Sequence, residues 1–584
     1  MSSRPARAVV AQIVPFGRGM AARPAFEQGR AISVSRNSRG RAELGDLVTV
    51  ALRGRGAKVT EVHGPADDPR VVLDAVLRDA GRLRRFSRAA LEEAQTSASV
   101  DVNADAGRRD LRDQAVVTID PEGAKDHDDA IAVERRAGGC RLFVHIADVA
   151  RFVRPGGALD QDAARRAFSA YVPGAVDPML PAELSAGACS LHAGVDRPVV
   201  TAQIDVAADG QFTSAAFYRA LIHSRRDFTY ADIDRHFDGA PLELPDLEAG
   251  IAAARELARA LRARRVARGA LEIESVEPRF RFDEGGVSSV ELETQTESHQ
   301  LIEECMIAAN EAVARQLLAR ELPGIFRVHD DPDESAIERL YEQLEALGVA
   351  TPPLADGPLG PRQRRAAAVA AAQALRRGGH GGAGDRALAV LVLRALKQAR
   401  YAVDASSHSG LASDAYLHFT SPIRRYPDLL AHRALLATIG ADGPSPSAQQ
   451  LSEAAFEASE REREIIEIER RATRICAALL LRRQLAEGAI SDIHEGEVVG
   501  VVGGGVFVAF GDAFEGFLPA RTIGDEYFSA DPLEIALVGQ RTGARLALGD
   551  RVDVRVVDVD HLRHRVDLEP ADGVVRRRRP PRLR

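Results

Sequence analysis

The chain has 584 residues, which at roughly 100–200 residues per domain predicts several domains. Its 45 % hydrophobic and 28 % charged residues exclude wholesale disorder and indicate a globular protein. No stretch approaches the ~20 uninterrupted apolar residues of a membrane helix, and Gln12 and Pro15 interrupt the short apolar run near the N-terminus, which argues against a secretory signal. The four cysteines are far apart and form no C-x-x-C pair, so we expect a reducing, cytoplasmic location.

The net charge of −8 is distributed unevenly along the chain. Residues 1–60 carry a net charge of +8 and residues 571–584 carry +5, which leaves −21 on the segment between them. Basic ends could contact phosphates, although Arg-rich termini are also typical of solvated tails. The acidic segment between them could hold metal ions.

The first elements in chain order are β-rich. Residues 1–65 contain short apolar strands separated by Gly, Arg and Asn turns, which predicts a small OB-type barrel. Residues 66–112 follow as a linker region with a helical piece at 90–95. Residues 113–445 alternate strands and helices, which indicates a large mixed α/β domain.

Within that domain we expect strands at 116–120, 140–149 and 199–206, and helices at 245–269 and 298–319. The segment 352–384 is rich in Pro and Gly and is predicted to be a loop. Residues 446–490 predict one long charged helix that closes the domain, since Glu and Arg recur at i,i+4. Residues 491–570 predict a second small barrel of five strands, followed by an Arg-rich tail at 571–584.

The most informative motif is TIDPEGAKDHDDA, at residues 118–130. It places Asp120 at the end of a strand and follows it closely with Asp126, Asp128 and Asp129. So many carboxylates on a short span repel one another unless cations lie between them, and Mg²⁺ prefers such oxygen ligands. The alternatives are a solvated acidic turn or a Ca²⁺ loop, but Gly123 precedes the paired aspartates and so does not fit the Ca²⁺-loop pattern.

A second motif, YLHFTSPIRRYPDLLAHR, covers residues 416–433. It contains Arg424 and Arg425 directly before a predicted helix start. A guanidinium in this position could bind a phosphate with two hydrogen bonds and stabilise transition-state charge. By itself, an arginine pair beside aromatic residues is more typical of a surface ion-pair site.

Seven ordered motifs resemble the ribonuclease II / ribonuclease R (RNB) family of hydrolytic 3′→5′ exoribonucleases. They are TIDPEGAKDHDDA, HIADV (145–149), SAYVPG (169–174), MLPAELSAGACSL (179–191), HQLIEECMIAAN (299–310), FRVHDDP (326–332) and HFTSPIRRYPDL (418–429). The resemblance implies a multidomain α+β protein: a mixed α/β RNB catalytic domain between a cold-shock-like N-terminal barrel and an S1-like C-terminal barrel. It also implies that single-stranded RNA enters a channel with its 3′ end first and leaves as nucleoside 5′-monophosphates.

The resemblance also implies roles for individual residues. Asp120, Asp126 and Asp129 would hold one or two Mg²⁺ ions, together with Asp128, the carboxylate most critical for hydrolysis. The RNA-contacting positions implied by the family are Arg424 as the catalytic arginine, Arg425 beside it at the phosphate, Tyr171 as a stacking aromatic near the 3′ end, and Tyr230 with Glu303 or Glu304 for choosing RNA over DNA. Without the family, the tyrosines read as half-buried aromatics and the glutamates as exposed helix residues. His145, Asp148 and His329 are expected to be structural.

Three departures from the family pattern stand out. His127 occupies a position that is usually apolar or aromatic, and we expect it to point away from the site. Ile273 stands where the family commonly has a Phe that clamps the terminal base, so RNA grip or product length could differ. The S1-like segment 492–570 has a net charge of −8, which is unfavourable for binding phosphates, although Phe507 and Phe517 could stack on bases.

These observations predict an Mg²⁺-dependent enzyme that degrades single-stranded RNA processively from a free 3′ end. The alternative is a catalytically inactive RNB-family protein that only binds RNA, and a DNA nuclease is a third reading. We expect a monomer with no membrane partner and no small-molecule cofactor. Whether structured RNA is degraded does not follow from the sequence.

Overall fold

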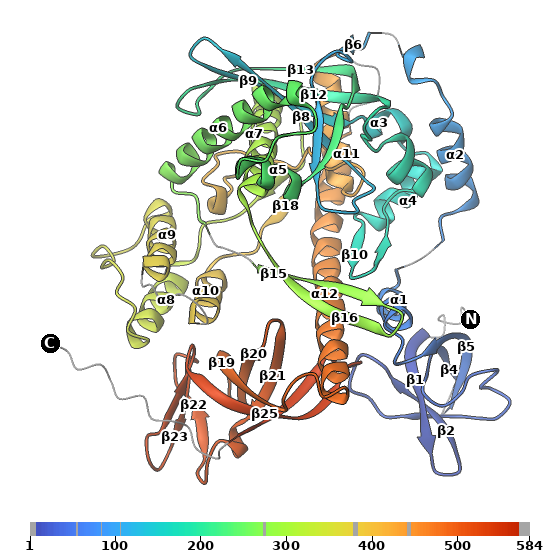
Figure 1. Cartoon of the computed structure of the whole chain (residues 1–584), viewed down its shortest axis with the longest axis vertical. Helices are drawn as coiled ribbons and strands as arrows, with labels where there is room; N and C mark the ends of the chain where they lie inside the picture. The colour runs from blue at the N-terminus through green and yellow to red at the C-terminus, as the bar shows by residue number, and fades with distance from the viewer. Residues whose placement is uncertain are drawn as a thin grey trace.

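The long helix α12 (Ala448–Ala486) connects the parts of the molecule in the computed structural model (Figure 1). The structure describes residues 8–53, 56–82, 85–105, 107–272, 276–377, 384–440 and 446–571. An α/β body occupies the upper part of Figure 1, and two β-barrels lie at the lower end of α12. At about 1.5 Å per residue, a helix of 39 residues is about 58 Å long, which is enough to reach from the body to the barrels.

The first barrel is formed by the N-terminal strands, as predicted. Its strands close in the order β1-β2-β3-β5-β4. Their bounds are β1 Ala8–Phe16, β2 Gly19–Pro24, β3 Ile32–Val34, β4 Asp46–Arg53 and β5 Gly56–Pro65. Ile13 and Val48 are buried in its interior. Helix α1 (Pro69–Asp79), which the sequence did not predict, packs between this barrel and α12.

A seven-stranded sheet forms the centre of the body, in the order β14-β7-β8-β9-β12-β13-β6. Its strands are β6 Arg109–Asp110, β7 Val117–Asp120, β8 Asp129–Arg136, β9 Gly139–Ala147, β12 Asp196–Ala207, β13 Phe212–His223 and β14 Arg226–Thr229. Strands β14 and β6 run parallel to their neighbours, and the other pairs are antiparallel.

Both faces of this sheet are covered because side chains alternate along each strand. In β8, Ile131 and Val133 pack with the helices α6 and α7, whereas Ala130 and Ala132 pack toward α2 and α4. The helices of the body and of the adjoining helical layer are α2 Arg88–Ala98, α3 Val149–Phe152, α4 Ala158–Arg166, α5 Tyr230–Phe237, α6 Glu248–Ala267, α7 Glu297–Ala319, α8 Glu334–Ala346, α9 Pro361–Arg377, α10 Gly384–Ala395 and α11 Tyr426–Thr438. The long predicted helices correspond to α6 and α7.

The prediction of a loop over 352–384 is wrong for its central part. Helix α9 spans Pro361–Arg377 inside that segment. Its sequence RQRRAAAVAAAQALRR is rich in alanine, the residue with the highest helix propensity. The prolines and glycines that suggested a loop flank this run and do not interrupt it.

The described part of the body also contains three two-stranded sheets: β10 Ala170–Val172 with β11 Ala175–Asp177, β15 Val276–Asp283 with β16 Gly286–Thr294, and β17 Phe326–Val328 with β18 Arg400–Ala402. The β15–β16 hairpin crosses α12 between the body and the barrels (Figure 1). Arg483 of α12 donates to Asp283 at 2.9 Å and so holds the hairpin against this helix.

The C-terminal barrel has the order β19-β20-β21-β26-β25, as predicted for an S1-like domain. Its strands are β19 Ile493–Val502, β20 Gly505–Phe510, β21 Phe514–Pro519, β25 Arg551–Asp560 and β26 Arg565–Pro570. The number of strands in this segment was underestimated. A separate three-stranded sheet, β22 Phe528–Ala530, β23 Ala536–Gly539 and β24 Arg545–Ala547, is inserted between β21 and β25.

Candidate active site

The aspartate motif forms the connection between β7 and β8, which are antiparallel neighbours in the sheet. Strand β7 ends at Asp120 and β8 begins at Asp129, so the intervening loop begins and ends at the same edge of the sheet. Gly123 has a φ of +83°, which favours glycine in this turn. The predicted strand–turn–strand arrangement of the four aspartates is therefore confirmed.

Asp128 is buried, with a relative exposure of 3 %. Its Oδ1 accepts a hydrogen bond from the backbone N–H of Ile423 at 2.8 Å, which links the aspartate loop to the loop that carries the arginines. Its Oδ2 lies 3.4 Å from Arg424 Nε and accepts no hydrogen bond from the described part of the chain. This oxygen is therefore a buried acceptor with a vacant lone pair beside a cation.

The electrostatics of the loop fit a divalent cation. Burial raises the pKa of Asp128 well above its usual range, although the positive charge of Arg424 opposes this. Burial and the charge of Asp120 raise the pKa of Asp129 to about 7. The protein thus brings carboxylates together without enough positive charge of its own to compensate them, and hard oxygen ligands of this kind suit Mg²⁺.

Arg424 and Arg425 have different environments, although they are adjacent in the chain. The Arg424 side chain is 45 % exposed, and its Nη2 donates to Ser421 Oγ at 3.1 Å. Arg425 is largely buried, and its Nη2 donates to Asp428 Oδ1 at 2.7 Å. The same Asp428 oxygen accepts from the Ser421 backbone N–H, so Arg425 holds the loop while Arg424 extends toward Asp128.

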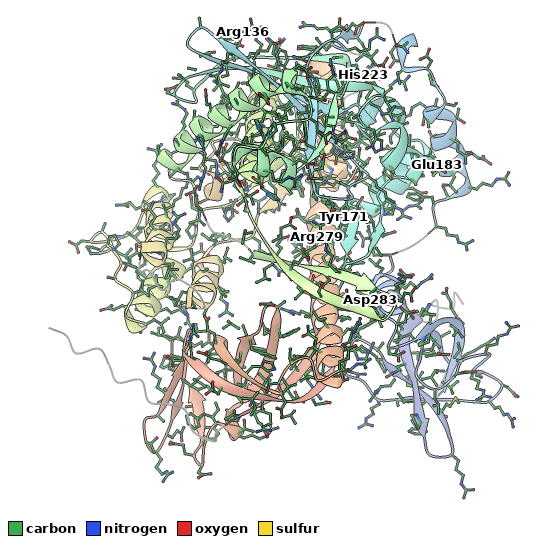
Figure 2. The ribbon with its side chains drawn as sticks, viewed as in Figure 1. Arg136, Tyr171, Glu183, His223, Arg279 and Asp283 are labelled. Atoms are coloured by element: carbon green, nitrogen blue, oxygen red, sulfur yellow. The ribbon has the colours of Figure 1, made fainter. Side chains whose placement is uncertain are left out.

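Tyr171 is brought to the aspartates by backbone pairing with the arginine loop. Phe168 forms an isolated antiparallel bridge with Arg425, and β10 begins two residues later. The Tyr171 hydroxyl donates to Asp126 Oδ2, and the Tyr171 backbone N–H donates to Glu469 of α12 at 2.8 Å. Tyr171 is 36 % exposed, and in the view of Figure 2 it lies at the end of the body that faces the β15–β16 hairpin.

Tyr230 lies beside the edge of the sheet that carries the aspartates, because β14 runs parallel to β7 with Thr229 opposite Asp120. A capping box between Thr229 and Asp232 starts α5 at Tyr230. The Tyr230 ring stacks on His299 of α7, with centroids 3.7 Å apart. Burial and the charge of Asp129 raise the pKa of the Tyr230 hydroxyl, which keeps it protonated.

The two candidate glutamates, Glu303 and Glu304, differ in their exposure to solvent. Glu303 lies one turn after His299 on α7 and is partly exposed, with Gln295 donating to its carboxylate. Glu304 is 3 % exposed, and Arg265 Nε donates to it at 2.9 Å. Glu303 is therefore the accessible member of the pair. Ile273 lies outside the described residues.

His127 does not point away from the site, so that prediction is wrong. Its Nδ1 lies 2.7 Å from Asp120 Oδ2, and its backbone N–H donates to Ser190 Oγ at 3.0 Å. Burial lowers the pKa of His127, but the hydrogen bond and charge of Asp120 outweigh this and raise it overall. The residue supports one of the predicted metal ligands.

In the C-terminal barrel, Phe507 and Phe517 are cross-strand neighbours with ring centroids 5.3 Å apart. Phe507 is 37 % exposed, whereas Phe510 is buried in the barrel core. In the body, His145 is fully buried and contacts Thr201, and Asp148 pairs with Arg108. The structural role predicted for these two residues is confirmed.

Sequence reasoning missed three supporting residues, His299, Glu469 and Asp428. His299 lies within a quoted motif, but nothing in the sequence pairs it with Tyr230, 69 positions earlier. Glu469 is one of many glutamates on the charged helix α12, and its contact with Tyr171 depends on tertiary structure. For Asp428, the sequence shows only an acidic residue in the first turn of a predicted helix, and it does not predict the ion pair with Arg425.

The chain thus combines an α/β body, in which carboxylates and an arginine converge at one edge of the central sheet, with two OB-type barrels. Comparison with known proteins agrees. The RNB domain family model matches residues 108–441, and the S1 RNA binding domain model matches residues 489–570. The chain belongs to the RNB family, and the resemblance inferred from its motifs is confirmed.

Curated relatives carry the name ribonuclease R. The chain is 34 % identical to ribonuclease R of Escherichia coli over 558 residues, which cover 90 % of this chain and 66 % of that protein. It is also 34 % identical to ribonuclease R of Thermotoga maritima over 530 residues, which cover 88 % of this chain and 72 % of that protein. The chain thus spans about two thirds of the length of the Escherichia coli relative.

Solved structures show the same architecture. The apo form of Mycoplasma genitalium RNase R matches with a TM-score of 0.87 and 26 % identity, over 97 % of this chain and 90 % of that one. The same enzyme has been solved with ribose-methylated single-stranded RNA. Yeast Ssd1, described as a pseudonuclease, shares the fold with a TM-score of 0.68 and 15 % identity, over 92 % of this chain and 68 % of that one. Among the described residues, every helix is too short or too polar to cross a membrane.

Proposed function

We propose that this protein is a hydrolytic 3′→5′ exoribonuclease that degrades single-stranded RNA processively to nucleoside 5′-monophosphates. One observation supports this proposal above the others: Arg424 Nε lies 3.4 Å from Asp128 Oδ2. Asp128 belongs to the same loop region between β7 and β8 as Asp120, Asp126 and Asp129. A carboxylate cluster that can hold metal ions and a half-exposed guanidinium beside it can together activate water and stabilise the charge that develops on a phosphodiester during hydrolysis.

Asp120, Asp126, Asp128 and Asp129 would hold one or two Mg²⁺ ions. The vacant lone pair of Asp128 and the raised pKa of Asp129 support this assignment. When bound, Mg²⁺ supplies an activated water and stabilises charge on the leaving oxygen. The orientation of Asp128 is fixed by the Ile423 backbone N–H, and that of Asp120 by His127.

The chain's own residues would bind and orient the RNA. Arg424 binds the scissile phosphate through its exposed guanidinium, and Arg425 fixes the loop that carries it. The exposed ring of Tyr171 stacks on a base near the 3′ end without regard to its identity. Tyr230 and Glu303 contact the 2′-hydroxyl, the group that distinguishes RNA from DNA.

We propose the domain roles as follows. The barrel of residues 1–65 and the S1-like barrel of residues 491–570 contact RNA outside the catalytic domain of residues 113–445. These units are connected by the linker region 66–112 and the helix region 446–490. The Arg-rich tail 571–584 follows the second barrel and lies almost entirely outside the described residues. We further propose a monomer that acts in the cytoplasm, which its four free cysteines support.

Asp128→Asn tests the proposal. The substitution conserves shape but removes the charge, so RNA binding should persist while release of nucleoside monophosphates from labelled single-stranded RNA is abolished. Asp113→Asn, at an exposed turn of the same domain, is the matched control and should behave like the parent protein. Undiminished release by Asp128→Asn would refute the mechanism. No release by the parent protein in Mg²⁺, with RNA binding intact, would favour an RNA-binding protein without turnover, the condition for which Ssd1 is named.

A further inference from the structure

Two histidines and a carboxylate from strand β14 converge next to the aspartate loop. His127, His192 and Asp227 each offer one ligand atom, and these atoms lie within 4.8 Å of one another. His127 precedes β8, and Asp227 lies on β14, the neighbour of β7 on its other side. His192 is brought there because the backbone N–H of Leu191 donates to the His127 carbonyl. His192 and Asp227 are outside the set of residues expected to hold Mg²⁺.

Both histidines have one ring nitrogen already engaged by an acceptor. His127 Nδ1 lies 2.7 Å from Asp120 Oδ2, and His192 Nε2 lies 3.1 Å from the Ala186 carbonyl oxygen. A carbonyl oxygen can only accept, so the proton of a neutral His192 is on Nε2. The remaining nitrogen of each neutral ring, His127 Nε2 and His192 Nδ1, then carries a lone pair. A histidine whose second nitrogen donates to a carboxylate or carbonyl is oriented in the way that metal-binding histidines are.

Asp227 completes the cluster with a fixed carboxylate. Its Oδ1 accepts from Thr118 Oγ1 at 3.1 Å and from the Ala193 backbone N–H at 2.8 Å. Its Oδ2 lies 3.9 Å from His192 Nδ1, which is too long for a hydrogen bond. The cluster therefore brings one nitrogen of each imidazole and a carboxylate oxygen within 4.8 Å of one another, close enough to share one cation.

We propose that His127, His192 and Asp227 bind one transition-metal ion of the Zn²⁺ type, separate from the Mg²⁺ expected at the aspartates. Two imidazole nitrogens and one carboxylate are a ligand set that suits Zn²⁺ and leaves a position for water, whereas Mg²⁺ prefers oxygen ligands alone. The side chains of His192 and Asp227 are 34 % and 32 % exposed, so an ion can reach the site from solvent.

The ion would also act on the catalytic edge of the sheet. A metal on His127 Nε2 keeps the proton of that ring on Nδ1, where it is donated to Asp120. The site therefore fixes the orientation of one predicted Mg²⁺ ligand. Metal binding at this site does not depend on the proposed exoribonuclease activity and can be measured without RNA.

The test measures metal binding by the full-length protein after chelator treatment, in excess Mg²⁺ to occupy the aspartates. Zn²⁺ is counted by equilibrium dialysis with elemental analysis, and Co²⁺ serves as a spectroscopic probe through its visible absorption. The parent protein should bind one equivalent of Zn²⁺, and bound Co²⁺ should show nitrogen coordination. His192→Asn and Asp227→Asn should each weaken binding by more than the ~10–100-fold that loss of a supporting hydrogen bond to a ligand causes.

His223→Asn is the matched control. His223, labelled in Figure 2, also pairs with a carboxylate, Asp196 at 2.8 Å, but it is not one of the three residues whose ligand atoms converge. This variant should retain the full equivalent of Zn²⁺. Circular dichroism verifies that each variant is folded, and the two ligand variants provide independent tests if one of them is not. Absence of a bound equivalent in the parent protein, or equal binding by the parent and the folded ligand variants, would overturn the proposal.

Discussion

Replacement of Arg424 by alanine should mainly lower the rate of RNA hydrolysis, whereas replacement of the adjacent Arg425 should mainly lower the stability of the fold. Arg424 is 45 % exposed and its contact with Asp128 is long, at 3.4 Å, so it contributes little to stability. Arg425 donates at 2.7 Å to Asp428, which is fully buried. The two side chains therefore separate a contribution to catalysis from a contribution to folding.

The expected magnitudes follow from these environments. Arg424→Ala should lower the rate of RNA hydrolysis by ~10²–10³-fold, the typical effect of removing one donor that stabilises transition-state charge. Its free energy of unfolding should change by less than about 1 kcal/mol. Arg425→Ala leaves the buried carboxylate of Asp428 without its cation, and breaking a buried pair in this way costs about 3–5 kcal/mol.

Two assays read these outcomes. Single-turnover release of nucleoside monophosphate at saturating RNA gives the rate, and urea unfolding followed by circular dichroism gives the stability. If Arg424→Ala lost stability while keeping its rate, or if Arg425→Ala unfolded at the same urea concentration as the parent protein, the assignment of the two roles would be refuted.

Three further predictions concern stacking, sugar recognition and acid stability. Tyr171→Ala should weaken binding of a fluorescent RNA oligonucleotide by ~1–3 kcal/mol in an anisotropy titration, and unchanged affinity would contradict a stacking role. Glu303→Gln should reduce the difference in hydrolysis rate between RNA and DNA substrates. Glu304→Gln should mainly lower the melting temperature, because its partner Arg265 is buried with it. If the two variants showed the opposite effects, the roles of these glutamates would be contradicted. Burial lowers the pKa of His145 to about 3, below its unfolded value of about 6.5, so the unfolded chain binds the extra proton first and stability falls as pH decreases from about 6.5 toward 3. In that window His145→Asn should flatten the pH dependence of the free energy of unfolding, measured by urea titration at each pH, by up to about 1.4 kcal/mol per pH unit. An unchanged slope would contradict this origin.

Local patterns predicted those parts of the molecule whose structure is decided locally. The aspartate motif sits between two strands that are recognisable by apolar runs, so its strand–turn–strand form followed from the sequence. The helices α6 and α7 follow a regular apolar periodicity over 20 and 23 residues. Helix α9 was missed because the loop prediction relied on the prolines and glycines that flank it and did not consider the alanine-rich sequence between them.

The contacts within the site depend on long-range pairing that no local pattern encodes. Asp128 meets Ile423 across 295 positions, and Tyr171 meets Glu469 across 298. The orientation of His127 toward Asp120 depends on the hydrogen bond from its backbone to Ser190, 63 positions away. Sequence reasoning could name the types of residue at the site, but it could not assign Arg425 and Glu304 to buried ion pairs.

The ion pairs of the S1-like barrel leave its net charge of −8 unchanged, but they occupy most of its arginines. Four of its seven arginines are paired with carboxylates of the same barrel: Arg551 with Glu495, Arg555 with Asp492, Arg563 with Asp560, and Arg565 with Asp567. Arginines that are already paired release few counterions when a nucleic acid binds, so the phosphate-dependent part of the affinity is small. The adjacent rings of Phe507 and Phe517 offer stacking, which depends only weakly on salt and tolerates any base. If this barrel binds RNA, the affinity should therefore come mainly from base stacking, and we propose that the scissile phosphate is bound by Arg424 in the body.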